Sequence, residues 1–230
     1  MMFWQSDYGP ALTLFLDALE RFRVLGDNIG VALSQLPLAL MQAGMGAIDE
    51  AIPRYEESLA LFEEAGDHWG RSIAINAMCW LATGLDLEQI PDSMFEEGVA
   101  AARKAGTDQE IGMALANLGR RKAFRGALIE GERIMKQSLQ ILSSHHYRGP
   151  ATTQMESLAE IALLRGQFER AVRVYGATSE VRSQLGTPVG EPFLSRLNGR
   201  VASLREKFTA EEFDLLWESG ARLGWERAVE

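Results

Sequence analysis

Large and small apolar residues recur along the chain at a spacing of 40 positions. One column holds large residues and the column four positions earlier holds small ones or proline: Phe15, Tyr55, Phe95, Met135 and Tyr175, preceded by Ala11, Ala51, Pro91, Gly131 and Ala171. Another pair of columns places an apolar residue directly before a small one: Leu38-Ala39, Met78-Cys79, Leu118-Gly119 and Leu158-Ala159. Because alternating large and small side chains let helices approach and interdigitate, this pattern predicts repeated pairs of packed helices.

Glycines mark the expected ends of these helices. Four of them lie 40 residues or a multiple of 40 apart, and His146 occupies the missing position: Gly26, Gly66, Gly106 and Gly186. A second series lies midway, with Asp86 replacing glycine in one unit: Gly46, Gly126 and Gly166. Glycine followed by Asp or Thr is typical of a helix C-terminus and the next N-cap. Each unit is therefore predicted to be helix A, a turn, helix B and a glycine-capped turn.

The third unit gives the clearest boundaries, with helix A predicted over residues 109–125 and helix B over 128–144. Interior prolines are few, as stacked helices require. Pro53, Pro91 and Pro150 are expected in or near first turns, where proline is tolerated. Pro37 lies inside a predicted A helix and is expected to kink it.

The two ends of the chain depart from the repeat. Residues 5–8 resemble the turn inside a helix pair and residues 11–25 a B helix without its A partner, so we expect this chain to be a fragment of a longer protein, or its start to be misassigned. After Gly186, a loop over 187–192 precedes a predicted helix over 193–207. The capping-box sequence at Thr209 then starts a helix to about Leu223, and a short turn over 225–229 closes the chain. This tail is predicted to cap the stack.

Composition restricts the class of protein. The chain has 230 residues, 47% of them hydrophobic, which is sufficient for a substantial core. Its net charge of −9 lacks the electrostatic footprint that phosphate backbones require, so this segment is not expected to contact nucleic acid directly. No signal peptide is evident, and the uncharged stretch 29–48 is interpreted as a buried helix rather than a membrane span. A cytoplasmic location is expected, without a membrane partner.

The sequence contains no recognisable catalytic or metal-binding motif, so we expect no enzyme activity, no cofactor and no metal. The sequence has no phosphate-binding GxxxxGK[ST] motif, no GxGxxG and no GxSxG. The single cysteine, Cys79, excludes an intrachain disulfide and is expected to be a buried, inert thiol. His145 and His146 have no further ligands nearby and are interpreted as basic groups at a helix C-terminus.

The order of large, small and aromatic residues resembles the tetratricopeptide repeat (TPR). Leu118-Gly119 with Gly131 and Met135 follows its spacing, as does Leu158-Ala159 with Ala171 and Tyr175. The usual repeat is about 34 residues, so 40 residues suggest longer helices. The resemblance implies an all-α, right-handed α-solenoid of antiparallel helix pairs with a C-terminal helical cap. We expect helical repeats over 1–186, a half repeat at 1–26 and full repeats at 27–66, 67–106, 107–146 and 147–186, then the cap over 187–230.

The tail carries a second, more specific resemblance. Its features are YGA at 175–177, LG followed by Pro188, LNGRV at 197–201, FDLLWESG at 213–220 and a closing ERAV. They are similar to the C-terminal end of large bacterial LuxR-type transcriptional regulators with a STAND-type ATPase module. The same ending occurs in some adenylate cyclase and protein kinase fusions. In those proteins the ATPase, DNA-binding or catalytic parts lie elsewhere.

In TPR arrays the A helices line a concave groove, and the resemblance carries that groove onto two columns of this chain. The first is Leu36, Asn76, Ala116 and Glu156, and the second is Leu40, Trp80, Arg120 and Glu160. Trp and Arg are enriched at binding hot spots, and Arg120 and Arg121 are suited to pairing with a carboxylate or phosphate. The candidate binding residues are Asn76, Trp80, Asn117, Arg120, Arg121, Glu156 and Glu160. The competing interpretation is that Trp80 packs between helices and the arginines are solvated.

These observations favour a non-catalytic protein-interaction or ligand-sensing domain of a bacterial transcriptional regulator. Its partner would be a protein, a peptide, its own ATPase or effector domains, or a small effector. Two alternatives remain open: a TPR scaffold attached to a signalling enzyme such as a cyclase or kinase, and a stand-alone adaptor.

Overall fold

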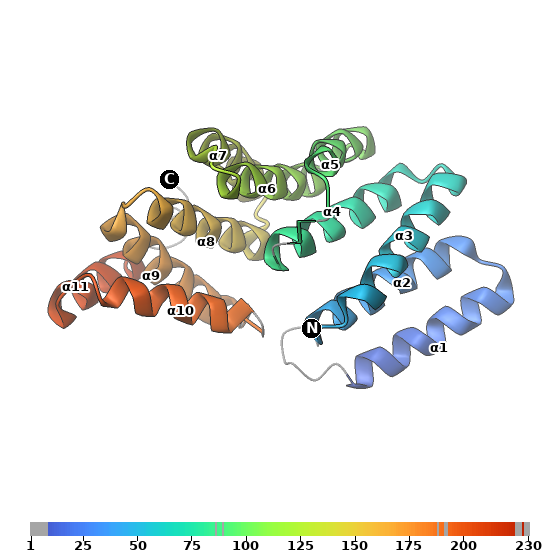
Figure 1. The fold of residues 1–230 in the computed structure, drawn as a ribbon, viewed down its shortest axis with the longest axis horizontal. Helices are drawn as coiled ribbons and strands as arrows, with labels where there is room; N and C mark the ends of the chain where they lie inside the picture. The colour runs from blue at the N-terminus through green and yellow to red at the C-terminus, as the bar shows by residue number, and fades with distance from the viewer. Residues whose placement is uncertain are drawn as a thin grey trace. The chain divides into compact units, whose positions relative to one another are not determined.

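The computed structural model describes residues 9–223 except 86, 89, 188, 191 and 192, together with residue 227; the side chains of residues 84 and 85 are also outside it. Within this part of the chain there are eleven α-helices and no strand (Figure 1). They are α1 (Gly9–Leu25), α2 (Asn28–Gly44), α3 (Ile48–Ala65), α4 (His68–Leu85), α5 (Asp92–Ala105), α6 (Asp108–Phe124), α7 (Leu128–Ser144), α8 (Arg148–Leu164), α9 (Phe168–Leu185), α10 (Phe193–Arg205) and α11 (Ala210–Ala221). The all-α prediction is confirmed.

Most predicted boundaries agree with these helices. α7 spans the predicted residues, and α6 begins and ends one residue early. The capping box is present, because the Thr209 hydroxyl accepts a hydrogen bond from the Glu212 amide at 3.3 Å and the Glu212 carboxylate accepts one from the Thr209 amide at 2.9 Å. The predicted turn at 5–8 lies outside the described residues, as do Asp86 and the predicted turn at 225–229 apart from residue 227.

The prolines and the uncharged stretch are placed as follows. Pro91 is the N-cap of α5 and Pro150 the third residue of α8, as expected. The expectation for Pro53 is wrong: α3 begins at Ile48, so Pro53 lies beyond its first turn. Pro37 lies inside α2, as predicted. α2 is a largely buried helix, and no helix of the described chain is long and apolar enough to cross a membrane.

Several helices end next to a residue whose backbone has the left-handed conformation, with positive φ. At Gly66, φ is +66°, and the next amide, that of Asp67, donates to the carbonyl of Phe62 at 2.9 Å. The turn after α7 has the same form, with the Tyr147 amide donating to the Leu142 carbonyl at 2.9 Å, although the left-handed residue is His146 at φ +59°. Among the described residues, His146 is the one non-glycine with positive φ. A side chain at such a position is strained because its Cβ crowds the backbone.

We expect His146→Gly to raise the free energy of unfolding by about 0.5–1 kcal/mol, because glycine adopts a left-handed conformation without that crowding. Urea unfolding followed by circular dichroism measures the change. His145→Gly is the matched control, since His145 has φ −101° and gains nothing from glycine there. An equal or greater stabilisation by the control variant would contradict this explanation.

The chain forms two compact units, residues 1–117 and 118–230, and the boundary predicted at Gly186 lies inside the second. In the first unit, α2 packs against α1 and α3, and α4 packs against α3 and α5 (Figure 1). Tyr55, Phe62 and Phe95 are fully buried between these helices. The Ser58 hydroxyl, also buried, donates to the Ala32 carbonyl at 2.9 Å and so joins α3 to α2.

The second unit is built on two very close helix crossings. α6 meets α7 where Gly119 faces Gly131, and a Cβ built on Gly131 would lie 2.6 Å from the Gly119 carbonyl oxygen. α9 meets α11 where a Cβ on Gly220 would lie 1.9 Å from the Arg173 carbonyl oxygen. Around these crossings lie two buried clusters, one with Met135 and Leu142 and the other with Tyr175, Leu204 and Phe213.

Candidate binding site

The predicted groove residues of the first unit lie in its interior. Asn76 on α4 and Asn117 on α6 have exposed fractions of 2% and 7%. The Asn76 amide donates to the Glu110 carboxylate at 3.1 Å and to the Glu110 backbone carbonyl at 3.3 Å, and the Asn117 amide donates to the Asn76 backbone carbonyl at 3.1 Å. These bonds join α4 to the first part of α6. Trp80 is half-buried on α4.

Glu110 supplies the carboxyl group of this network and is 8% exposed. Burial raises its pKa, because the charged form loses water, and the hydrogen bond from Asn76 acts in the opposite direction. The side-chain carbonyl of Asn76 has no hydrogen-bond partner in the described structure. The network therefore links helices and leaves one buried acceptor open.

The second unit brings three charged residues together in a row. Glu160 on α8 lies between Arg120 on α6 and Arg200 on α10, at 3.4 Å and 2.5 Å. The Glu160 side chain is 9% exposed and that of Arg120 is 13% exposed. The guanidinium of Arg120 also lies over the Phe124 ring, 5.3 Å from its centroid. Two predicted site residues thus meet, and one carboxylate holds arginines from two other helices.

Glu156, the remaining predicted residue of α8, forms a separate pair with α9. Its carboxylate accepts hydrogen bonds from Arg182 at 2.6 Å and 2.8 Å, a two-pronged contact. Arg182 also donates to the Thr153 hydroxyl and to the Thr187 carbonyl. Arg121 lies on the same helix as Arg120 and is 5% exposed, so the expectation that it is a solvated arginine is wrong.

The phenol of Tyr175 lies among these charged groups. It is 1% exposed, and its hydroxyl has no hydrogen-bond partner among the described residues. Burial raises the pKa of this phenol strongly, and the nearby Glu160 raises it further while Arg200 opposes the rise. The hydroxyl is therefore a neutral, buried donor next to three arginines and two glutamates, and each of these arginines pairs with one of the glutamates.

Sequence reasoning did not identify Arg182 and Arg200 as members of this cluster. The signal for Arg200 was present, because Arg120, Glu160 and Arg200 are 40 residues apart. It was missed because residues after Gly186 were interpreted as a cap that no longer follows the repeat. Nothing in the spacing of Arg182 distinguishes it from other arginines on B helices.

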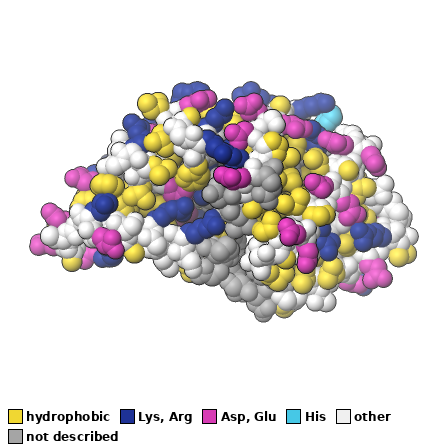
Figure 2. Space-filling model, in the orientation of Figure 1, with side chains coloured by type: hydrophobic (Ala, Val, Ile, Leu, Met, Phe, Trp, Pro, Cys, Tyr) yellow, Lys and Arg dark blue, Asp and Glu magenta, His cyan; other side chains and the backbone are white. Residues whose placement is uncertain are grey.

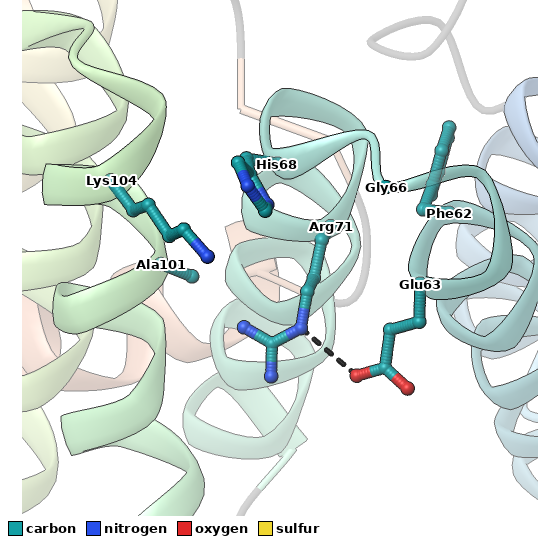
Figure 3. Close-up of a pocket in the computed structure, with 7 residues that line it drawn as sticks. All are labelled: Phe62, Glu63, Gly66, His68, Arg71, Ala101 and Lys104. Carbon is teal, nitrogen blue, oxygen red and sulfur yellow. Dashed lines mark hydrogen bonds and ion pairs between the residues drawn. The ribbon is translucent and has the colours of Figure 1, made fainter.

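A further hollow lies in the first unit, at the turn between α3 and α4 and beside the end of α5 (Figure 3). Its volume is ≈ 220 Å³, and it is lined by Phe62, Glu63, Gly66, His68, Arg71, Ala101 and Lys104. Arg71 donates to Glu63 at 2.9 Å and also pairs with Glu97. The arginine of this hollow therefore already has two carboxylate partners.

Other predicted chemistry can be placed within the described residues. Cys79 is 1% exposed, as expected for a buried thiol. In that part of the chain, no group of three His, Cys, Asp or Glu side chains could hold a metal ion. The acidic pairs at 63–64 and 96–97 are exposed on helix faces.

A third charged cluster, missed from the sequence, surrounds Glu132 at the start of α7. This glutamate is 6% exposed and pairs with Arg170 at 2.9 Å, with Lys136 at 3.1 Å and with Arg165. Burial alone raises the pKa of this carboxyl, but the hydrogen bonds from Arg170 and Lys136 outweigh it and lower the pKa to about 2. The cluster joins the turn between α6 and α7 to the turn between α8 and α9.

The lowered pKa of Glu132 gives a pH-dependent prediction. Its folded pKa lies below the ordinary 4.5, so its contribution is complete above pH 4.5 and is lost as the pH falls towards 2. We expect Glu132→Gln to lower the free energy of unfolding by about 2 kcal/mol at pH 7. The difference from the parent protein should shrink in urea unfolding at pH values below 4.5. A difference that is independent of pH would contradict the proposed charge effect, with Glu169→Gln as an exposed control.

The fold and these clusters define an all-helical protein whose neighbouring helices are joined by buried polar and ionic links. A comparison with known protein families and with curated proteins finds no match for this chain.

Proposed function

We propose that this chain is a TPR-type α-solenoid with a 40-residue period, whose A-helix face binds a protein or peptide partner. In this proposal it is the interaction or sensing domain of a multidomain bacterial transcriptional regulator, and it acts without catalysis in the cytoplasm. The partner is another protein or the regulator's own ATPase and effector domains. The A helices are α2, α4, α6 and α8.

Equivalent backbone hydrogen bonds support the period. After α3, α7 and α9, the amides of Asp67, Tyr147 and Thr187 donate to the carbonyls of Phe62, Leu142 and Arg182, which are 40 or 80 residues apart. The turns inside the pairs have a second such series, in which Ala47, Leu87, Ala127 and Gln167 donate to Gln42, Ala82, Lys122 and Ala162. Backbone geometry that recurs with the sequence is expected of stacked repeats.

The observation that carries the functional proposal is the row Arg120–Glu160–Arg200. Residues at equivalent positions of successive A-type helices meet on one face, which is how a solenoid builds a continuous recognition surface. Their neighbour Tyr175 supplies a further donor. Arginine and buried aromatic residues are the types that dominate the energy of protein interfaces.

Peptide selection tests this function directly. A library of random peptides is displayed on phage and selected on the immobilised protein, and the Kd of each selected peptide is then measured by fluorescence anisotropy. We expect Arg120→Met, which keeps an apolar side chain but removes the guanidinium from Glu160 and Phe124, to weaken binding about tenfold. Arg222→Met, the same change on the exposed C-cap residue after α11, serves as the control. Failure to enrich any peptide, or equal loss in the control variant, would refute the proposal.

The assignment to a transcriptional regulator has its own test. The coding region that surrounds this segment is expected to encode an ATPase module and a helix-turn-helix. A cyclase or kinase domain in its place would replace this assignment with the signalling-enzyme scaffold.

A further inference from the structure

Charge is distributed very unevenly between the two units. Residues 1–117 contain 18 Asp or Glu and six Lys or Arg, whereas residues 118–230 contain 14 Asp or Glu and 17 Lys or Arg. The positive excess lies in residues 118–173, which contain ten Lys or Arg and five Asp or Glu. The chain as a whole carries −9, so its net charge conceals a basic segment. An excess of positive charge within an acidic protein points to a surface with a separate task, because average composition does not produce it.

Much of this positive charge lies at one edge of the second unit. We call this the turn edge: residues 122–136 and 164–173, which comprise the α6–α7 and α8–α9 turns with the adjoining parts of their helices. Its exposed or half-buried basic residues are Lys122, Arg125, Arg133, Lys136, Arg165, Arg170 and Arg173. Glu132 holds the edge together, because it pairs with residues of α7, of the α8–α9 turn and of α9. Glu130 and Glu169 are also exposed at this edge, and Glu169 pairs with Arg173 at 3.1 Å. Seven basic residues against three acidic ones leave the edge with a net positive charge.

Apolar side chains are exposed at the same edge. Ile129 is 77% exposed, Leu164 is 53% exposed and Phe124 is 40% exposed. Phe124 and Leu164 end α6 and α8, and Ile129 belongs to the first turn of α7, next to Glu132. Hydrophobic side chains also lie among charged ones elsewhere on the face shown in Figure 2. At the turn edge, three large apolar groups and an excess of arginine occur on turns that ion pairs hold together.

We propose that the turn edge docks an acidic, amphipathic segment of a partner protein, through apolar contacts to Phe124, Ile129 and Leu164 and carboxylate contacts to the surrounding arginines. This surface adjoins the A-helix face, since Phe124 also lies beneath the guanidinium of Arg120, but it has a different set of anchors and does not depend on the proposed function. Arginine pairs well with carboxylates because its planar donors match two oxygens. Charge complementarity selects the acidic partner, and the apolar side chains anchor it.

The apolar residues also decide between an acidic protein and a nucleic acid. Phosphate backbones are bound by basic and polar side chains, and exposed Ile129 and Leu164 add nothing to such contacts. Burying the same two side chains against an apolar stripe removes hydrocarbon from water and strengthens a protein complex. The carboxylates beside that stripe then meet Arg133, Arg165 and Arg170.

Three synthetic helical peptides test the proposal by fluorescence anisotropy with the whole chain. The first has leucines along one face and glutamates on the flanks, the second replaces glutamate by lysine, and the third replaces leucine by serine. We expect the first to bind about tenfold more tightly than either of the others, and high salt to weaken it. Ile129→Ser, Leu164→Ser and Arg133→Ser should each weaken its binding, and all three leave the partners of Glu132 in place.

An exposed residue of α11 and its exposed C-cap residue supply matched controls. Leu215, which is 62% exposed, and Arg222 are changed to serine, and binding of the acidic peptide should be unaffected. Equal binding of the three peptides, or equal losses in edge and control variants, would overturn the proposal. Tighter edge-dependent binding of duplex DNA or of anionic vesicles would overturn it too. So would edge-dependent self-association in sedimentation velocity, which would identify a second copy as the occupant.

Discussion

Replacing Gly220 by alanine is expected to lower the free energy of unfolding of the second unit by about 3 kcal/mol or more. The new Cβ would lie 1.9 Å from the carbonyl oxygen of Arg173 and 2.7 Å from its carbonyl carbon. Because both obstructing atoms belong to the backbone of α9, no side-chain rotation can relieve the overlap. α9 and α11 must separate, which opens the contact between Phe213, Trp217 and the core below them.

Urea unfolding followed by tryptophan fluorescence measures this loss, and hydrogen exchange of the α11 amides shows where it occurs. Gly199 in α10 is the matched control, because a Cβ there meets nothing within 4 Å. Gly199→Ala should leave stability unchanged or raise it by about 0.5–1 kcal/mol, as alanine favours a helix interior. If Gly220→Ala were as well tolerated as the control, the close crossing of α9 and α11 would be wrong.

The helices were predictable from the sequence because their ends are marked by local chemistry. Thr209 and Glu212 form a capping box, and Gly66 and its counterparts end B helices. Each of these signals involves only residues that are close together in the sequence. His146 was visible as the odd member of its column, although the sequence could not show that the histidine adopts the left-handed backbone of the glycines. Local signals of this kind do not depend on the rest of the fold.

Burial at the candidate site was harder to predict, since it depends on which helices meet. Asn76 was assigned to a groove by its column and Arg121 as the neighbour of Arg120, yet their exposed fractions are 2% and 5%. Polar residues on an A helix can face a neighbouring helix as readily as solvent, and the repeat pattern does not distinguish the two. The crossing of α9 and α11 was equally hidden, because Gly220 looks like any glycine near a helix end.

The charge distribution was missed for a different reason. A net charge is a sum over the chain, and −9 combines an acidic first unit with a basic stretch in the second. The inference that the chain lacks a basic surface therefore does not extend to its turn edge. Counting charges for each predicted repeat would have revealed the asymmetry, although not that Glu132 gathers three of the cations.

Removing the charge of Glu160 is expected to be the second large effect. Glu160→Leu should lower the free energy of unfolding by about 3 kcal/mol, because Arg120 and Arg200 then face each other without their carboxylate. The side chain of Arg120 is only 13% exposed, so water can compensate little of this loss. Urea unfolding at constant pH measures the change, and Glu169→Leu is the control, since the 65% exposed Glu169 pairs with Arg173 at the surface.

A triple variant separates a missing partner from a general packing defect. In Arg120→Met, Glu160→Leu, Arg200→Met, the charges are removed together and replaced by apolar side chains of similar length. Because a well-packed apolar group can match a buried ion pair in stability, we expect the triple variant to recover most of the loss of the single one. Although its stability recovers, the triple variant should no longer bind peptides that were selected on the A-helix face. If the triple variant were less stable than Glu160→Leu alone, the ionic row would itself be the source of stability, and its role in recognition would have no separate support.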